Sequence, residues 1–558
     1  MCIVRHVAIL IRSLLVGCAV VLMVVTTSGT TRAQPPATPT LFPTPLPLPP
    51  TTSVWVAPSI PRDVLRLFEP LRTSLPLAGE QSAEVQLVSA PSSGLYGTTW
   101  VYVPVVPFPT VADNIQLSDV LRYWQGDASA LGYLNPRGKA PILYLADTTL
   151  VWLQALLGAP AAAAPIMVVP EDGLASALWV NRPAAWSILP FDRLDPALKV
   201  LTVDGRSVFD RSLRLDQYPF VQYITLTGNA DKVNTVVQVL QADGHWPPTN
   251  RDVNKMTIAV MTGVTALVRA TAFAMETNSI NFPAQDLLPF LADADIVHTS
   301  NEVSFSPNCP YPNPAYQADG LVFCSRDTYF DLLKTIHLNV VELTGNHVLD
   351  WGTAAMTHTL DIYDANKIAY FGGGRNTEDA RKSMEIDDHG NSIAFIGCNP
   401  AGPLYAWATA EAPGSAACDD DFMRAEIARL KMQGKIVIVT LQYEEYYTYT
   451  PPPDQVEFFK KYTDFGADLV MGSQAHQPQG FGFTEKAFIH YGIGNLFFDQ
   501  MADLGTRQMF ADKLIFYNGR HLSTVLFTGL IEDYARPRPM TAQERTDFLT
   551  TIFQASGW

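Results

Sequence analysis

Residues 340–352 read VVELTGNHVLDWG, and this stretch decides how the second half of the chain is interpreted. A short apolar run, Val340–Leu343, passes directly into the polar turn Thr344–His347. A buried strand that ends in a polar turn is typical of α/β proteins, in which ligand sites gather beyond the carboxyl ends of the strands. Asn346 and His347 are therefore candidate site residues.

The same arrangement recurs along the second half of the chain. Other apolar runs are followed by polar or glycine-rich turns at Gly263–Thr265, Ser300–Glu302, Gln442–Glu445, Gly472–His476 and Gly492–Asn495. Helical patterns, such as residues 329–336 and 420–431, stand between these runs. Because the carboxyl ends of neighbouring parallel strands meet at one edge of a sheet, we expect one cleft to collect the polar side chains Glu302, Asn346, His347, Gln474 and His476.

Five segments of this half carry a resemblance to a known family. They are SNEV, ELTGNHVLDWG, YFGGGRNTEDA, GSQAHQPQG and IHYGIGNLFFDQ. Their order and spacing resemble the capsule-synthesis CapA family, which is associated with poly-γ-glutamate synthesis. The family fold is the four-layer α/β/β/α metallophosphatase sandwich. The resemblance implies a metallophosphatase-like hydrolase site within a CapA-like domain spanning 255–558.

The resemblance also implies roles for individual residues. Glu302, Asn346 and His476 take the positions of metal ligands. His347 takes the position of a catalytic histidine, with Asp350 placed to orient its ring. In such a site a metal-bound hydroxide attacks the substrate, and the metal and histidines stabilise the charge that develops. Three further positions are expected to contact the substrate: Gln442, Gln474 and Asn495.

Three positions depart from the family pattern. Val264 stands where the family has an aspartate, and Gln442 and Gln474 stand where it has histidines. Valine cannot bind a metal and glutamine is a poor, uncharged ligand. A two-metal centre is therefore not expected, and the choice between one divalent metal ion and a metal-free site stays open. The alternative function is a non-catalytic polymer-binding or scaffold protein with a degenerate metal site.

The composition sets the class of partner. The chain has 558 residues, 47% of them hydrophobic, which predicts a globular protein of two or three domains. Its net charge is −16, and no run of basic residues interrupts it. Such a chain repels nucleic acid. The expected partners are an anionic or saccharide surface polymer and other capsule-synthesis membrane proteins.

The first residues predict export. Arg5 and Arg12 precede the apolar stretch Ser13–Val25, which has the length of a signal-peptide core and is short for a membrane span. Residues 1–33 are therefore interpreted as a signal peptide or membrane anchor; Cys18 leaves a lipoprotein open as well. Each of these interpretations places the rest of the chain outside the cytoplasm. Residues 34–52 form a Pro/Thr-rich linker.

Residues 53–245 predict a smaller N-terminal α/β domain. Apolar strands such as Trp100–Val106 and Pro141–Leu145 alternate with helical patterns such as Leu117–Trp124. Parts of this region resemble a periplasmic solute-binding module of the phosphate-binder type. A structural α/β domain without a ligand is the equal alternative.

Four cysteines lie beyond the export segment. An even number in an oxidising compartment suggests two disulfides, and three connectivities are open. Cys309–Cys324 and Cys398–Cys418 are preferred because each pair closes a local loop. Four unpaired thiols are the alternative.

Overall fold

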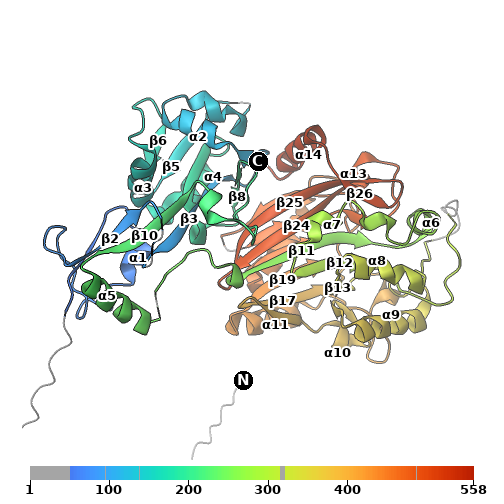
Figure 1. Cartoon of the computed structure of the whole chain (residues 1–558). Coiled ribbons are helices and arrows are strands. Elements are labelled where there is room, and N and C mark those ends of the chain that lie inside the picture. The colour runs from blue at the N-terminus through green and yellow to red at the C-terminus, as the bar shows by residue number, and fades with distance from the viewer. Residues whose placement is uncertain are drawn as a thin grey trace, which may run out of the picture. The chain divides into compact units, whose positions relative to one another are not determined.

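The computed structural model describes residues 51–92, 94, 96–136, 138–244, 246–313, 321–485 and 487–558 (Figure 1). The predicted export segment, residues 1–33, and all but the last two residues of the predicted linker lie outside this range. Across the described residues, no helix has both the length and the apolar character needed to cross a membrane.

The N-terminal part of the chain is built on a mixed sheet. The strand order is β1 (Val54–Val56), β2 (Val85–Ala90), β10 (Val221–Gly228), β3 (Thr98–Pro107), β7 (Ala185–Pro190), β5 (Ile142–Leu145) and β6 (Ile166–Val168), with β8 (Leu198–Val200) pairing with β3. The accompanying helices are α2 (Leu117–Trp124), α3 (Asp147–Leu157), α4 (Leu174–Val180) and α5 (Ala230–Ala242). This part is therefore α/β, as the alternating pattern predicts.

The second sheet carries the first group of polar strand ends. Its order is β14 (Ala369–Phe371), β13 (Val340–Glu342), β12 (Ile296–Asn301), β11 (Met256–Thr265), β24 (Gln508–Tyr517), β25 (Arg520–Glu532) and β26 (Arg536–Pro539), and β23 (Asn495–Phe497) also pairs with β11. Strands β11 to β14 are parallel to one another. Their carboxyl ends therefore meet at one edge, as expected.

The third sheet carries the second group. Its order is β16 (Met384–Asp388), β17 (Asn391–Cys398), β19 (Ile436–Leu441), β20 (Leu469–Gly472), β22 (Phe488–His490) and β21 (Phe481–Phe483). The four strands β17, β19, β20 and β22 are parallel, so the ends of β19 and β20 also point the same way.

Three hydrophobic cores hold these two sheets and their helices together. One core joins the sheets, since Met261 and Val340 of the second sheet pack with Phe395, Ile438 and Met471 of the third. A second core packs the other face of the second sheet on α6 (Arg269–Thr277), α8 (Phe330–Thr335) and α9 (Gly352–Asn366). A third core packs the third sheet on α11 (Asp420–Met432) and α12 (Pro453–Phe465). Alternate side chains of each strand feed opposite faces, which is why one strand serves two cores.

The C-terminal hairpin and helix follow local sequence signals. Asn518 and Gly519 join β24 to β25 with φ values of 51° and 74°, the backbone that a two-residue hairpin turn requires. The last helix, α14 (Ala542–Ala555), begins with a capping box in which the Thr541 and Glu544 side chains each bond the other's backbone N–H.

Both preferred disulfides are present. Cys309 pairs with Cys324 and Cys398 pairs with Cys418. The alternative of four unpaired thiols is therefore wrong.

Candidate functional site

Close backbone packing at the strand ends brings the predicted site residues together. A Cβ atom added to Gly345 would lie 2.7 Å from Cα of Glu302, and one added to Gly263 would lie 1.8 Å from the Gly494 carbonyl oxygen. A Cβ at Gly472 would lie 1.9 Å from the Tyr491 carbonyl oxygen. Only glycine permits such approaches, and they bring the turns after separate strands into direct contact.

Glu302, Asn346 and Gln442 are in contact with one another. The Gln442 Nε2 group donates to Glu302 Oε1 at 3.0 Å and lies 3.3 Å from Asn346 Oδ1. Glu302 and Gln442 are each only 1% exposed. The carboxylate and the two amides therefore form one cluster at the ends of β12, β13 and β19, in which Asn346 is half-buried.

The Glu302 carboxyl group is held in an unfavourable setting for a charge. Burial raises its pKa well above the usual value, and the nearby charges of Glu445, Glu342 and Asp350 raise it further. No cationic side chain is among the causes of this shift. The cleft therefore has an excess of acidic groups that a bound cation would offset.

His347 and Asp350 form a pair just after the end of β13. His347 Nδ1 lies 2.7 Å from Asp350 Oδ2, and the same oxygen accepts from the Phe323 backbone N–H at 3.0 Å. The Asp350 side chain is 1% exposed and that of His347 is 18% exposed. The aspartate thus fixes the ring from inside, and the Nε2 atom of His347 stays available to a ligand.

His476 is the second histidine of the cleft. Its Nδ1 atom donates to Asn495 Oδ1 at 2.7 Å, which leaves Nε2 as the acceptor, 3.6 Å from Glu445 Oε1. Burial lowers the pKa of His476, and the His347 ring is among the charges that lower it further. Asn495 is fully buried, and its Nδ2 group donates to the Thr506 carbonyl oxygen at 3.0 Å. The Asn495 side chain, which was expected to contact the substrate, therefore contacts His476 in this structure.

Several residues that contact this cluster belong to none of the predicted site positions. Ser473 Oγ lies 2.9 Å from Gln442 Oε1 and 2.8 Å from Glu342 Oε1, so it links the cluster to a second buried carboxylate. Glu342 also accepts from Thr344 Oγ1 at 2.5 Å, and His298 Nε2 lies 3.5 Å from its other oxygen. Glu342 ends the apolar strand β13, and its charge is the only sequence feature that sets it apart from that strand.

Comparison with known proteins identifies this part of the chain. The family described as bacterial capsule synthesis protein PGA_cap matches residues 258–500. This segment belongs to the capsule-synthesis CapA family. Capsule biosynthesis protein CapA of Bacillus anthracis is 26% identical over 304 residues, which are 53% of this chain and 72% of that relative. PGA biosynthesis protein CapA of Bacillus subtilis is 26% identical over 170 residues, 30% of this chain and 45% of that relative.

Likeness to solved structures is weaker. A 5′-nucleotidase precursor from Thermus thermophilus aligns with a TM-score of 0.31 and 13% identity, covering 54% of this chain and 59% of its own. An ABC-type phosphate transport receptor from Vibrio cholerae aligns with a TM-score of 0.30 and 9% identity, covering 35% of this chain and 94% of its own.

Two residues of the CapA domain supply oxygen donors of the type that a divalent cation accepts. Glu302 and Asn346 offer oxygen atoms that already converge on the Gln442 amide group. Gln474 is 5% exposed, and its Oε1 atom has no hydrogen-bond partner among the residues described. Carboxylate and amide oxygens are ligands that hard cations such as Mg²⁺, Mn²⁺ and Ca²⁺ accept. Val264 is fully buried and offers no donor, so the set does not fit a second cation.

Proposed function

We propose that the CapA domain is a hydrolase of cell-surface polymer synthesis, of the capsule or poly-γ-glutamate type, with a metallophosphatase-like site. The supporting observation is the convergence of Glu302, Asn346, His347 and His476 from three separate strand ends, those of β12, β13 and β20. We further propose that the two facing sheets with helices outside them are the four-layer α/β/β/α sandwich, and that the N-terminal sheet is a solute-binding type of module.

The residues divide the chemistry between them. Glu302, Asn346 and His476, with an amide oxygen of Gln442 or Gln474, would hold one divalent cation, which supplies Lewis acidity at the reacting oxygen. His347 acts as a general acid when both of its ring nitrogens carry a proton: Asp350 holds the Nδ1–H, and the Nε2 proton passes to the leaving group. His476 has a lowered pKa, so its neutral Nε2 atom accepts a proton or binds the cation.

The proposed setting is outside the cytoplasm. Two disulfides in the CapA domain are consistent with an oxidising compartment. The proposed partners are an anionic or saccharide polymer and the other membrane proteins of capsule synthesis.

The test of the catalytic role is a histidine substitution with a matched control. We expect His347→Ala to lower hydrolysis of a generic phosphodiester, or of a γ-linked glutamate polymer, by about 100-fold or more, as for loss of a general acid. His358→Ala is the control, because His358 also pairs with an aspartate, Asp327, at 3.0 Å but lies on the outer helix α9. Hydrolysis that survives His347→Ala unchanged would refute the site.

Metal analysis distinguishes the enzyme from the alternative. We expect about one equivalent of Mn²⁺ to bind the purified chain, and the binding to be lost in Glu302→Ala and His476→Ala. If the wild type binds polymer but holds no metal, as the two variants also should not, the non-catalytic scaffold is supported instead.

A further inference from the structure

Arg269 occupies an unusual backbone position beside the cleft. It opens helix α6 with a φ of 46°, in the left-handed region that residues other than glycine rarely adopt. Backbone strain of this kind persists only where the surrounding structure enforces it, and it concentrates at functional sites. None of the motifs in the sequence draws attention to this residue.

A buried carboxylate fixes the guanidinium group of Arg269. Asp499 Oδ2 accepts from Arg269 Nε at 3.2 Å and from the Ala270 backbone N–H at 2.8 Å, and Oδ1 accepts from Nη2. The Asp499 side chain is fully buried, whereas that of Arg269 is 15% exposed. Because Asp499 takes the Nε–Nη2 edge of a planar group, the Nη1 end is directed away from it. No hydrogen bond to Nη1 is found within the described part of the chain.

Two aromatic rings connect this guanidinium group to the two histidines of the cleft. The Arg269 Cζ atom lies 5.1 Å from the ring centre of Phe323 and 4.8 Å from that of Phe498. Phe323 contacts His347 with ring centres 4.7 Å apart, and Phe498 contacts His476 at 5.2 Å. Arg269 is therefore separated by one side chain from His347 and by one from His476.

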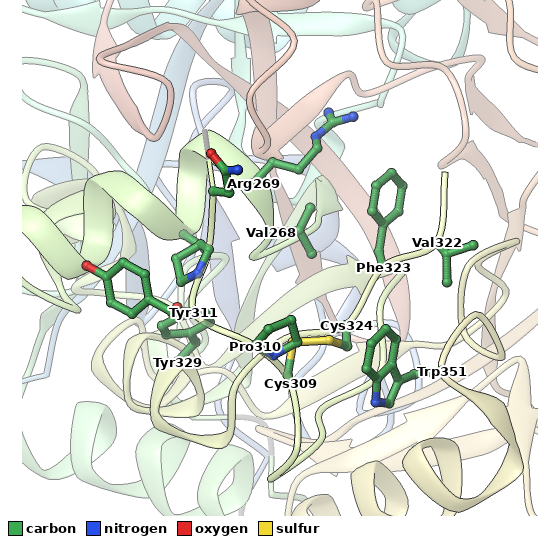
Figure 2. A pocket seen from close by; sticks show the side chains of 13 residues that line it. Val268, Arg269, Cys309, Pro310, Tyr311, Val322, Phe323, Cys324, Tyr329 and Trp351 are labelled. Atoms are coloured by element: carbon green, nitrogen blue, oxygen red, sulfur yellow. A yellow bond between two sulfur atoms is a disulfide. The ribbon is translucent and has the colours of Figure 1, made fainter. Parts of the chain in front are cut away.

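A cavity of about 460 Å³ lies next to Arg269 and Phe323. Arg269 and Phe323 line it together with the aromatic side chains of Tyr311, Tyr329 and Trp351 (Figure 2). Its size lies within the range of small-ligand pockets, roughly 300–1,000 Å³. Most of the lining is apolar or aromatic, and Arg269 is its one arginine among the residues described.

We propose that Arg269 binds an oxyanion of the substrate, either a carboxylate or a phosphate group, and that the adjoining part of the same molecule fills this cavity. The Nη1 end of a fixed guanidinium group suits an oxyanion, which arginine binds through its planar fork. An anionic substrate also needs such a residue, because the acidic side chains of Glu445, Glu342 and Asp350 gather around Glu302 and oppose the approach of an anion. This proposal rests on the proposed function, since it places the substrate beside His347 and His476.

Binding measurements on the full mature chain test the proposal. The probes are inorganic phosphate and a short γ-linked glutamate oligomer, with the same oligomer carrying amides in place of carboxyl groups as the neutral comparison. We expect Arg269→Gln to weaken binding of the anionic probe about 10- to 100-fold, the effect of one charge-assisted hydrogen-bonding group, and to leave the neutral oligomer unaffected. The probe that the wild type prefers distinguishes a phosphate from a carboxylate substrate.

Two further variants separate recognition from structure. Arg269→Lys keeps a cation beside Asp499 but loses the fork, so we expect normal thermal stability with weakened binding. Arg326→Gln is the matched control: Arg326 also pairs with a carboxylate, Glu276, and lies 5.8 Å from the Tyr311 ring of the same cavity. We expect less than a twofold change in binding for this variant.

The outcomes keep the two proposals apart. Equal binding by the wild type and both Arg269 variants, or no binding of either anionic probe by the wild type, overturns the role of Arg269 even if hydrolysis is found. Binding that depends on Arg269 in a chain without hydrolytic activity supports this inference and removes the hydrolase.

Discussion

The Gln442 side chain has two arrangements that differ little in shape. With its nitrogen toward Glu302 and Asn346, it donates to both oxygens and accepts from Ser473. Turned by half a rotation about its last bond, it presents an oxygen to the same two atoms and donates to Ser473 instead. The first arrangement suits a cleft without metal, and the second completes a set of three oxygen ligands.

Replacing this amide with a carboxylate tests its place in the cluster. We expect Gln442→Glu to melt about 5 °C lower than the wild type in EDTA, because it adds a charge beside Glu302 and Glu342. Millimolar Mn²⁺ should reverse that loss by binding the folded state. The control is Gln442→Leu, which adds no charge and should respond to Mn²⁺ less than Gln442→Glu does. Identical melting of Gln442→Glu with EDTA and with Mn²⁺ would place Gln442 away from any cation.

Strand β11 needs a glycine at position 263, where its backbone packs directly against the turn at Gly494. Gly263→Ala in β11 should lower the free energy of unfolding by about 3 kcal/mol, because its Cβ would overlap the Gly494 carbonyl and displace β23. Gly173→Ala is the control, since no atom lies within 4 Å of its Cβ position. Denaturant unfolding of both variants gives the difference, and equal stability would contradict the close packing.

The turn that follows β7 carries a carboxyl group with an altered titration. Burial raises the pKa of Asp192 to about 6. A carboxyl group whose folded pKa is raised favours folding at low pH and loses that contribution as the pH rises through 6. We expect Asp192→Asn to gain about 3 kcal/mol relative to the wild type between pH 4 and pH 8, measured by denaturant unfolding. Asp192→Glu should keep the dependence on pH, and a parallel pH profile for Asp192→Asn would disprove the assignment.

Elements with a local signal were predictable, and long-range pairs were not. The apolar run Ile436–Leu441 coincides with β19, and the helical pattern of Leu117–Trp124 coincides with α2. The capping box at Thr541 and the turn at Asn518 were equally local. By contrast, Arg269 and Asp499 are 230 residues apart, and neither belongs to a periodic pattern. Spacing along the chain contains no information about such a contact.

At the scale of the whole molecule, the sequence predicted which segments meet but not how their atoms are paired. Glu302 and Asn346 could be assigned to one edge because β12 and β13 are neighbouring parallel strands, whereas His476 follows β20 of a different sheet. That Gln442 bonds two of them, and that Asn495 holds the third, depends on side-chain positions set by packing. The direction of each amide is a property of the assembled fold.

Both disulfides lie within the CapA domain, so the stability of the chain should depend on redox conditions. They close loops with sequence separations of 15 and 20 residues. Loops of this size stabilise a fold by about 3 kcal/mol each. We expect a reducing agent to lower the melting temperature by about 10 °C or more, measured by calorimetry. The double variant Cys309→Ser with Cys324→Ser should respond about half as strongly, and an unchanged melting temperature under reduction would argue against both contributions.

The glycine crossings at residues 263, 345 and 472 leave the main chain little freedom at the cleft, whatever side chains it bears. Chemistry can therefore be exchanged there without rebuilding the protein. The residue types usual in the family are aspartate at position 264 and histidine at positions 442 and 474. We expect these side chains to fit on the existing turns without a change in the backbone. A triple substitution of this kind should create a second cation site beside the one that we propose.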